Sequence, residues 1–413
     1  MPCIFCIYCV SHGGMPMNHN AKKTVILSIL SLICFFLIGC QKTPDEVTKR
    51  MANYGKNHQM NSEKLTYCTI DELQNTKLSD LDIETENIDL PDNINFSDIE
   101  GIGTIDMAFE QNVLDKAEKY LKIFNIKKDV VPSDLYVNTG DKIKIYDDKS
   151  DNFLEIENNG FIYYQSGISY YMMNNDVMQA ITAKYDTDSD DISKASIKLK
   201  SGTIPLKDVC NSAQSWLKNN FHENGCTYKV SDIWIKTIHY DKVDNNQILM
   251  LAEVRYKGVP FNTYGTSVTT NNNKGKVSLM IYDINMSYDD SLEITDFSNG
   301  SGQLIIKKYT KADRVLDLNS AIRIVNERMS GFNKLKIDKI IPLYALFPQY
   351  NADEEFFSKS NQNVLARPVY AFIIQDDTMD DENATEIYKS NSCKYIFVDM
   401  LTGELTTNIG ERS

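Results

Sequence analysis

Two stretches of the chain carry the same order of secondary-structure signals, 112 residues apart. Apolar residues recur three or four positions apart over residues 206–221 and again over residues 318–329, which is the spacing of an amphipathic helix. Two strand-like runs and a hairpin follow each helix, and the hairpin begins at Asn285 in the first stretch and at Phe397 in the second. This order predicts a unit of helix, strand, strand and hairpin that occurs twice.

The strand-like runs decide the fold class. The first strand of each unit is VSDIWIKTIHY from Val230 or IDKIIPLYALF from Ile337, and the second is ILMLAEVRY or PVYAFIIQ. Each helix must bury its apolar stripe, and an antiparallel sheet built from these strands offers a face for it. We therefore predict an α+β fold with antiparallel sheets, and with units at residues 201–309 and 310–413.

A further folded region is expected before these units, at residues 65–200. An apolar stripe from Val113 to Phe124 predicts a helix. The runs DKIKIYDD, NFLEIE and GFIYYQSG follow with strand-like alternation, and Asn158-Asn159-Gly160 has the composition of a turn. The sequence therefore predicts an N-terminal α+β region with hairpin strands.

An apolar run without charges occupies residues 24–38, TVILSILSLICFFLI, directly after Lys22 and Lys23. A basic start and an apolar stretch of this length are typical of a secretory signal peptide. A membrane-spanning helix needs about 20 apolar residues, so an uncleaved short anchor is the second interpretation. We predict that residues 1–39 are a signal peptide, and that translation begins at Met15 or Met17.

The apolar run ends in Leu37-Ile38-Gly39-Cys40, which resembles the lipobox of bacterial lipoproteins. In that family the cysteine thiol receives a diacylglyceryl group and the cysteine becomes the first residue of the mature chain. The resemblance implies a lipid anchor on Cys40, palmitate among its acyl chains, and attachment to the extracytoplasmic face of the cell membrane. Two or more acyl chains hold a protein there stably. The polar residues 40–64 are then expected to form a tether.

The charge of the chain bears on its partners. The formal net charge is −14, and removal of residues 1–39, with two lysines and no acid, makes it −16. Phosphate contacts need basic side chains, so no nucleic acid is expected as a partner. Buried free thiols are preferred to disulfides in a chain of this size, but both readings remain open for four cysteines. These are Cys68, Cys210, Cys226 and Cys393.

The end of the second unit, YIFVDMLTGE from Tyr395 to Glu404, resembles the closing hairpin of PepSY-type domains. Asp399 and Gly403 suit its tight turn, because glycine tolerates a positive φ. In the first unit Asp290-Ser291-Leu292 stands in place of Thr-Gly-Glu. The run YKGVP at residues 256–260 is similar to a turn of exported regulatory proteins of Gram-positive bacteria. As a whole the chain resembles uncharacterised lipoproteins of clostridia-like bacteria, and the PepSY likeness implies a regulatory binding module without catalytic residues.

Motifs that carry chemistry are missing from the sequence. It has no zinc-protease helix, nucleophile elbow or phosphate-binding loop, so we predict no enzymatic activity and no cofactor. The run YDTDSDDIS places Asp186, Asp188 and Asp190 at the alternate spacing of a calcium loop, without the Gly and Glu that an EF-hand requires. A solvated acidic turn is the preferred reading there, and a calcium site is the alternative.

These features predict a membrane-tethered extracytoplasmic lipoprotein that acts as a non-catalytic binding or regulatory module for a membrane-protein or cell-wall partner. One alternative is a solute-binding lipoprotein. Another is a glycan-active enzyme of the cell wall with paired carboxylates, which 57 acidic residues could supply. Tyr163 and Tyr164 lie in strand-like sequence, so one ring should face each side of a sheet, either as packing or to stack on a wall sugar.

Overall fold

The structure, a computed structural model, divides the chain after Lys64, and residues 65–413 form one compact unit. The expected signal peptide, Cys40 and tether lie outside the described residues. The description covers the following segments: 65–81, 85–109, 117–126, 136–138, 142–147, 152–157, 160–167, 178–186, 190–221, 225–240, 243–263, 283–299, 304–328, 334–349, 363–374 and 394–407.

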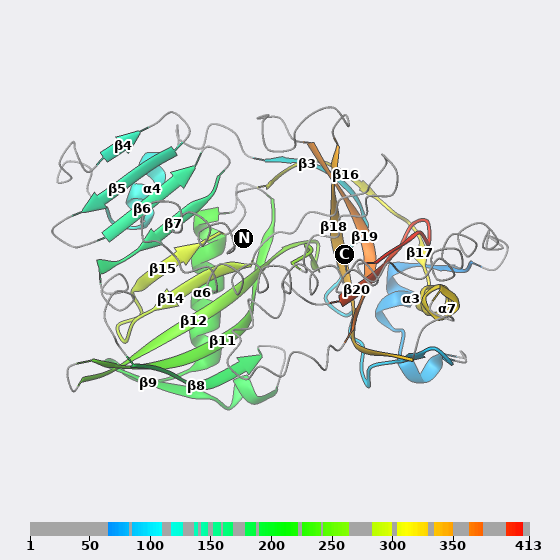
Figure 1. The fold of residues 1–413 in the computed structure, drawn as a ribbon, viewed down its shortest axis with the longest axis horizontal. Coiled ribbons are helices and arrows are strands. Elements are labelled where there is room, and N and C mark those ends of the chain that lie inside the picture. The colour runs from blue at the N-terminus through cyan, green and yellow to red at the C-terminus, as the bar shows by residue number, and fades with distance from the viewer. Residues whose placement is uncertain are drawn as a thin grey trace, which may run out of the picture. The chain divides into compact units, whose positions relative to one another are not determined.

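The larger sheet contains ten strands within these segments, and all of its pairings are antiparallel (Figure 1). The strand order is β4-β5-β6-β7-β15-β14-β12-β11-β8, and β13 pairs with β12. The strands are β4 Tyr136–Asn138, β5 Lys142–Asp147, β6 Asn152–Glu157, β7 Ile162–Gln165, β8 Met178–Asp186, β11 Thr227–Tyr240, β12 Val243–Tyr256, β13 Val259–Pro260, β14 Ile284–Tyr288 and β15 Ile294–Ser298.

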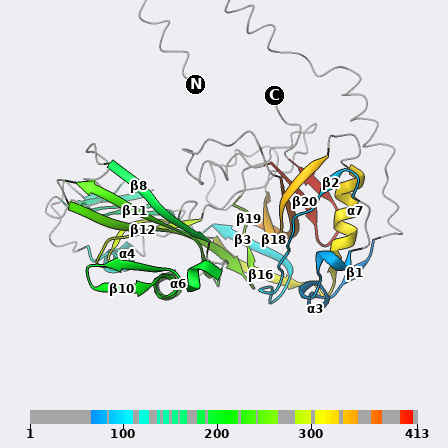
Figure 2. The same ribbon diagram turned by 90° about the horizontal axis from the view of Figure 1, so that it is seen from below.

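Helix α6 (Leu206–Phe221) covers one face of this sheet at β11 and β12 (Figure 2). Its buried side chains are those of the apolar stripe predicted from the sequence: Leu206, Val209, Cys210, Ala213, Leu217 and Phe221. Helix α4 (Ala117–Ile123) adds Tyr120 to the same core, and Phe124 stacks on Tyr164 with ring centroids 4.5 Å apart. The alternation of strand residues places every second side chain on this helical face.

The smaller sheet has seven strands among the described residues, in the order β16-β3-β19-β18-β2, with β20 beside β19 and β21 beside β20. Among the described strand-to-strand pairings of this sheet, only the short β18–β2 pairing is parallel. The strands are β2 Ile88–Asp89, β3 Gly103–Phe109, β16 Leu304–Lys311, β18 Leu335–Gln349, β19 Asn363–Ile374, β20 Lys394–Asp399 and β21 Leu405–Thr407. Helix α7 (Leu318–Arg328) lies beside β20 (Figure 2).

One edge of β19 changes partner halfway along the strand. Residues 363–366 pair with β3, and residues 369–374 pair with β20. The change falls at Arg367 and Pro368. Proline has no N–H to leave unpaired at such a break, and the Pro368 carbonyl accepts the N–H of Met400 at 2.9 Å.

Several short elements accompany the two larger sheets. Helix α3 (Ile70–Gln74) begins with a capping box, in which Thr69 and Glu72 each satisfy a backbone N–H of the other. The remaining elements are η2 Leu78–Asp80, η5 Asp190–Ser193 and two strand pairs, β1 Tyr67–Cys68 with β17 Val315–Leu316, and β9 Ser196–Leu199 with β10 Gly202–Pro205.

The predicted α+β class is confirmed, and most of the secondary structure is antiparallel sheet. The strands of residues 65–200 are distributed differently from the expected N-terminal region. Strand β3 lies in the seven-stranded sheet, whereas β4 to β8 lie in the ten-stranded sheet. Strand pairing is set by long-range contacts between edges, which local sequence patterns do not record.

Candidate binding site

The turn between β20 and β21 is held by Asp399. Its Oδ1 accepts the backbone N–H groups of Leu401 at 2.9 Å and Thr402 at 2.8 Å. Gly403 has a φ of 72° and donates its N–H to the Asp399 carbonyl at 2.8 Å. The roles expected for Asp399 and Gly403 are therefore confirmed in the geometry of the turn.

The turn between β14 and β15 has a related geometry. Asp289 Oδ1 accepts the N–H groups of Ser291 and Glu293, and the residue with positive φ is Leu292, at 61°. This turn is one residue shorter than the turn between β20 and β21, because Leu292 follows Asp289 by three positions and Gly403 follows Asp399 by four.

Arg367 binds this turn from the neighbouring strand. Its Nη2 lies 2.7 Å from Asp399 Oδ2 and 3.4 Å from Thr402 Oγ1, and its Nη1 lies 3.6 Å from Glu404 Oε2. The Asp399 side chain is only 6 % exposed, while that of Glu404 is 49 % exposed. The Arg367–Asp399 pair is thus the shielded contact, and Glu404 is the solvent-facing acid.

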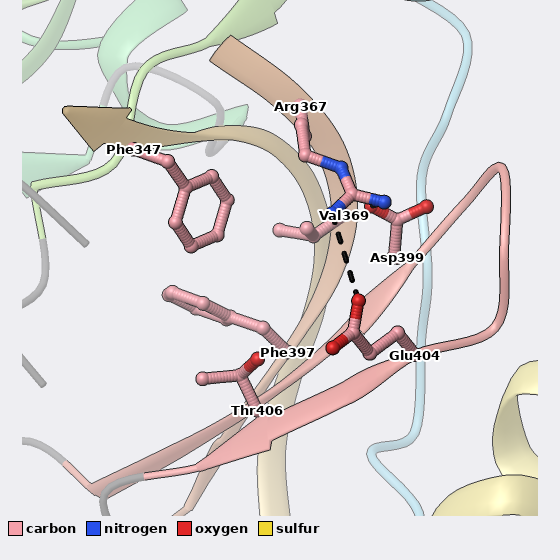
Figure 3. Close-up of a pocket in the computed structure, with 7 residues that line it drawn as sticks. All are labelled: Phe347, Arg367, Val369, Phe397, Asp399, Glu404 and Thr406. Carbon is pink, nitrogen blue, oxygen red and sulfur yellow. Dashed lines mark ion pairs between the residues drawn. The ribbon is translucent and has the colours of Figure 1, made fainter. Parts of the chain in front are cut away.

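A shallow depression lies beside this charged group (Figure 3). Phe347 and Phe397 line one side, with Val369, and Arg367 with its acids lines the other. The open volume is about 10 Å³, close to what one water molecule needs. Drug-sized ligands occupy pockets of about 300–1,000 Å³, so the depression is too small to enclose a solute of that size.

Comparisons with known proteins show a likeness of fold and indicate no activity. No protein-family model and no curated protein matches the chain. The crystal structure of an uncharacterized protein from Eubacterium rectale aligns with a TM-score of 0.50 and 13 % identity, covering 82 % of this chain and 97 % of that one. The likeness is one of fold.

The predicted site residues fall mostly outside the described part of the chain. This holds for Leu37, Ile38, Gly39 and Cys40, and for Asp188 of the acidic run. Asp186 ends β8 and Asp190 begins η5, but their side chains are not described, so the calcium alternative stays a prediction. Among the described residues, no three histidine, cysteine or acidic side chains could together hold a metal ion, and no helix could span a membrane.

Aromatic residues of the ten-stranded sheet divide between its two faces as predicted. Tyr164 is buried under the helices, whereas Tyr163 is half-buried on the other face, 6.0 Å from Phe153. Trp216 on α6 packs edge-on against Phe297 at 5.6 Å. Trp234 is buried on the sheet face opposite α6. The strand pattern alone could not tell which of the two faces it occupies.

The described cysteines are free thiols. Burial raises the pKa of Cys68 and of Cys210 to about 11, and that of Cys226 to about 12. The thiolate is the reactive form, so at pH 8 we expect alkylation at least about 100-fold slower than for an exposed cysteine. Peptide mass spectrometry after a timed iodoacetamide pulse, with guanidinium-unfolded protein as control, measures each site. Rapid labelling of Cys226 in the folded protein would contradict its burial.

A second polar group was not apparent in the sequence. Asp283, directly before β14, and Asn285 each have a buried side-chain oxygen without a hydrogen-bond partner. Burial and the nearby Glu253 raise the pKa of the Asp283 carboxyl well above its usual range. A DIN run has no motif character, so only the strand pairing reveals this cluster.

Proposed function

We propose that the protein is a lipid-anchored module on the extracytoplasmic face of the cell membrane that binds a protein or cell-wall partner without catalysing a reaction. The observation that carries the proposal is the Leu-Ile-Gly-Cys sequence at residues 37–40, at the end of an apolar run preceded by two lysines. The lipid on Cys40 would confine the folded unit, residues 65–413, to the membrane surface.

We further propose that two copies of one unit make up much of the folded part. Two observations support this. The order of α6, β11, β12, β14 and β15 is the order of α7, β18, β19, β20 and β21, and the strands lie in the sheets as 15-14-12-11 and 21-20-19-18. In each final hairpin, an aspartate at the turn also accepts two backbone N–H groups through its Oδ1. These aspartates are Asp289 and Asp399.

The hairpin of the second copy, with its PepSY-like sequence, is the proposed binding surface. The depression beside it combines apolar side chains with one cation and two acids, and Glu404 is exposed for a contact. A surface of this composition, on a scaffold of antiparallel strands, suits recognition of a side chain from a partner. The small volume of this depression would not enclose a drug-sized solute.

Lipidation is tested by labelling. The chain is expressed in a Gram-positive host with radiolabelled palmitate, as wild type, Cys40→Ala and Cys68→Ala. We expect label on the wild type and on Cys68→Ala, and none on Cys40→Ala, because the thiol that accepts the lipid is gone. The wild type should sediment with membranes after high-salt washing. Label that persists on Cys40→Ala would contradict the lipoprotein assignment.

Partner binding is tested separately by cross-linking on intact cells. A photo-cross-linker placed at Glu404 should capture a defined partner, whereas the same group at the exposed Asp338 of β18 should not. Equal products from both positions would argue against the hairpin as the binding surface and leave lipidation unaffected.

A further inference from the structure

The start of strand β14 contains two acceptor oxygens without a donor. Oδ1 of Asp283 and Oδ1 of Asn285 are shielded from solvent, although each residue as a whole is half-buried. Alternate residues of a strand share a face, so both side chains lie on the same side of the sheet. The Asn285 amide is turned toward residue 283, since its Nδ2 donates to the Asp283 carbonyl at 3.4 Å. Buried acceptors in native proteins nearly always have a donor.

The neighbouring strand supplies a carboxylate and a cation that is already bound. Asn285 pairs with Leu251 and Ile284 with Ala252, so continuation of this register places Asp283 opposite Glu253. Arg255 contacts Glu253 Oε2 through Nε at 2.9 Å and through Nη2 at 2.6 Å. Its remaining Nη1 reaches the Gly258 carbonyl at 3.3 Å. No ion pair of Arg255 with Asp283 exists in the described structure.

The charged groups of the other strands make the environment more negative. Asp232 of β11 pairs with Leu251, in the row that contains Asn285. Lys229 pairs with Glu253, but its Nζ binds Asp98 at 3.3 Å. Asp296 of β15, opposite Ser287, is a further acid on this face, but it has the cation Lys236 of β11 nearby. An ionised Asp283 would therefore be a buried anion among anions, which is costly.

We propose that Asp283 is held as a neutral carboxylic acid whose O–H donates to Asn285 Oδ1, and that this shared proton ties down the start of β14. A single proton provides the missing donor and removes the charge, so both unpartnered oxygens are explained together. A metal ion is the less favoured occupant, because no three acidic side chains among the described residues come together to bind one.

The shared proton should make the stability of the fold depend on pH. The pKa of folded Asp283 is raised, first by burial and then by Glu253 and Asp232, with Arg255 opposing them. The folded state therefore binds a proton that the unfolded state has lost, and stability falls as pH rises from the unfolded pKa, about 4, to the folded pKa. Below that window both states are protonated, so the stability that Asp283 contributes is fully present and does not vary with pH. Above the folded pKa its ionisation should loosen the pairing of β14 with β12.

The test is thermal unfolding of the full chain in mild detergent between pH 4 and pH 9. Asparagine has the shape of the neutral acid and keeps a hydrogen-bond donor. Asp283→Asn should therefore melt at least about 3 °C above wild type at pH 8–9, and at the same temperature as wild type at pH 4. Asp106→Asn, at an exposed residue of β3, removes the same charge and should follow wild type at every pH. A difference between Asp283→Asn and wild type that does not vary with pH would overturn the proposal.

Two further readouts separate a proton from a metal ion. The infrared band of a protonated carboxyl should be present in the wild type at pH 7 and absent in Asp283→Asn, even if that variant is less stable. EDTA or calcium chloride should leave the melting temperature unchanged. A missing band, or a calcium-dependent rise that Asp283→Asn abolishes, would show that the oxygens have another partner.

Discussion

Gly258→Ala is expected to destabilise the folded unit by more than about 3 kcal/mol, or to prevent folding. Gly258 has a φ of 80°, and a Cβ at this position would overlap the carbonyl oxygen of Asp98 and lie 2.7 Å from its carbonyl carbon. Both obstacles are backbone atoms, so no side-chain rotation can relieve them.

The turn has little room to move away. The Lys257 carbonyl accepts the N–H of Glu100 at 2.9 Å, and strand β13 follows at once. Directly after β13, Phe261 bridges to Tyr344 of β18, and the Asn262 N–H binds the Tyr344 carbonyl at 2.9 Å. The turn thus connects a strand of the ten-stranded sheet with residues of the seven-stranded sheet.

Gly225→Ala is the matched control. Its φ is 74°, close to that of Gly258, but a Cβ there would meet only a side-chain methyl group of Ile306 at 3.8 Å. The control should lose only the backbone term, about 1–2 kcal/mol. Guanidinium unfolding followed by tryptophan fluorescence measures both variants. Equal losses of stability in the two variants would mean that the close approach to Asp98 does not contribute to the effect.

Arg367→Met should cost about 2–4 kcal/mol, which is the second largest expected effect. Methionine keeps much of the length and the apolar part of the side chain, but it leaves the shielded Asp399 carboxylate without its cation. The loss stays below that of a fully isolated charge, because Asp399 retains the N–H groups of Leu401 and Thr402.

Two variants separate the contributions of the acids. Glu404→Gln should change stability by less than about 0.5 kcal/mol, because Glu404 is half exposed and 3.6 Å from Arg367. Adding Asp399→Asn to Arg367→Met should restore part of the loss, since the buried charge is then removed. Additive losses in the double variant, measured by the same unfolding assay, would show that the pair is not coupled.

The local elements of this protein were readable from its sequence. The apolar stripe over residues 206–221 predicted the side chains that α6 buries, and alternation predicted strands β5, β6 and β7. Asp399 and Gly403 predicted a tight turn from local effects. The Asp399 carboxylate binds a nearby backbone N–H, and Gly403, without a side chain, adopts a positive φ. The signal peptide and the lipobox are also local features, and they stay predictions.

Only the tertiary structure decided which strands share a sheet. Strand β3 pairs with β16 and β19 about 200 residues or more along the chain, and Arg367 meets Asp399 where β19 changes partner. The cluster around Asp283 likewise arises from three strands. Periodicity reports the face on which a residue lies but not the neighbour across the sheet, because pairing depends on the packing of the whole unit.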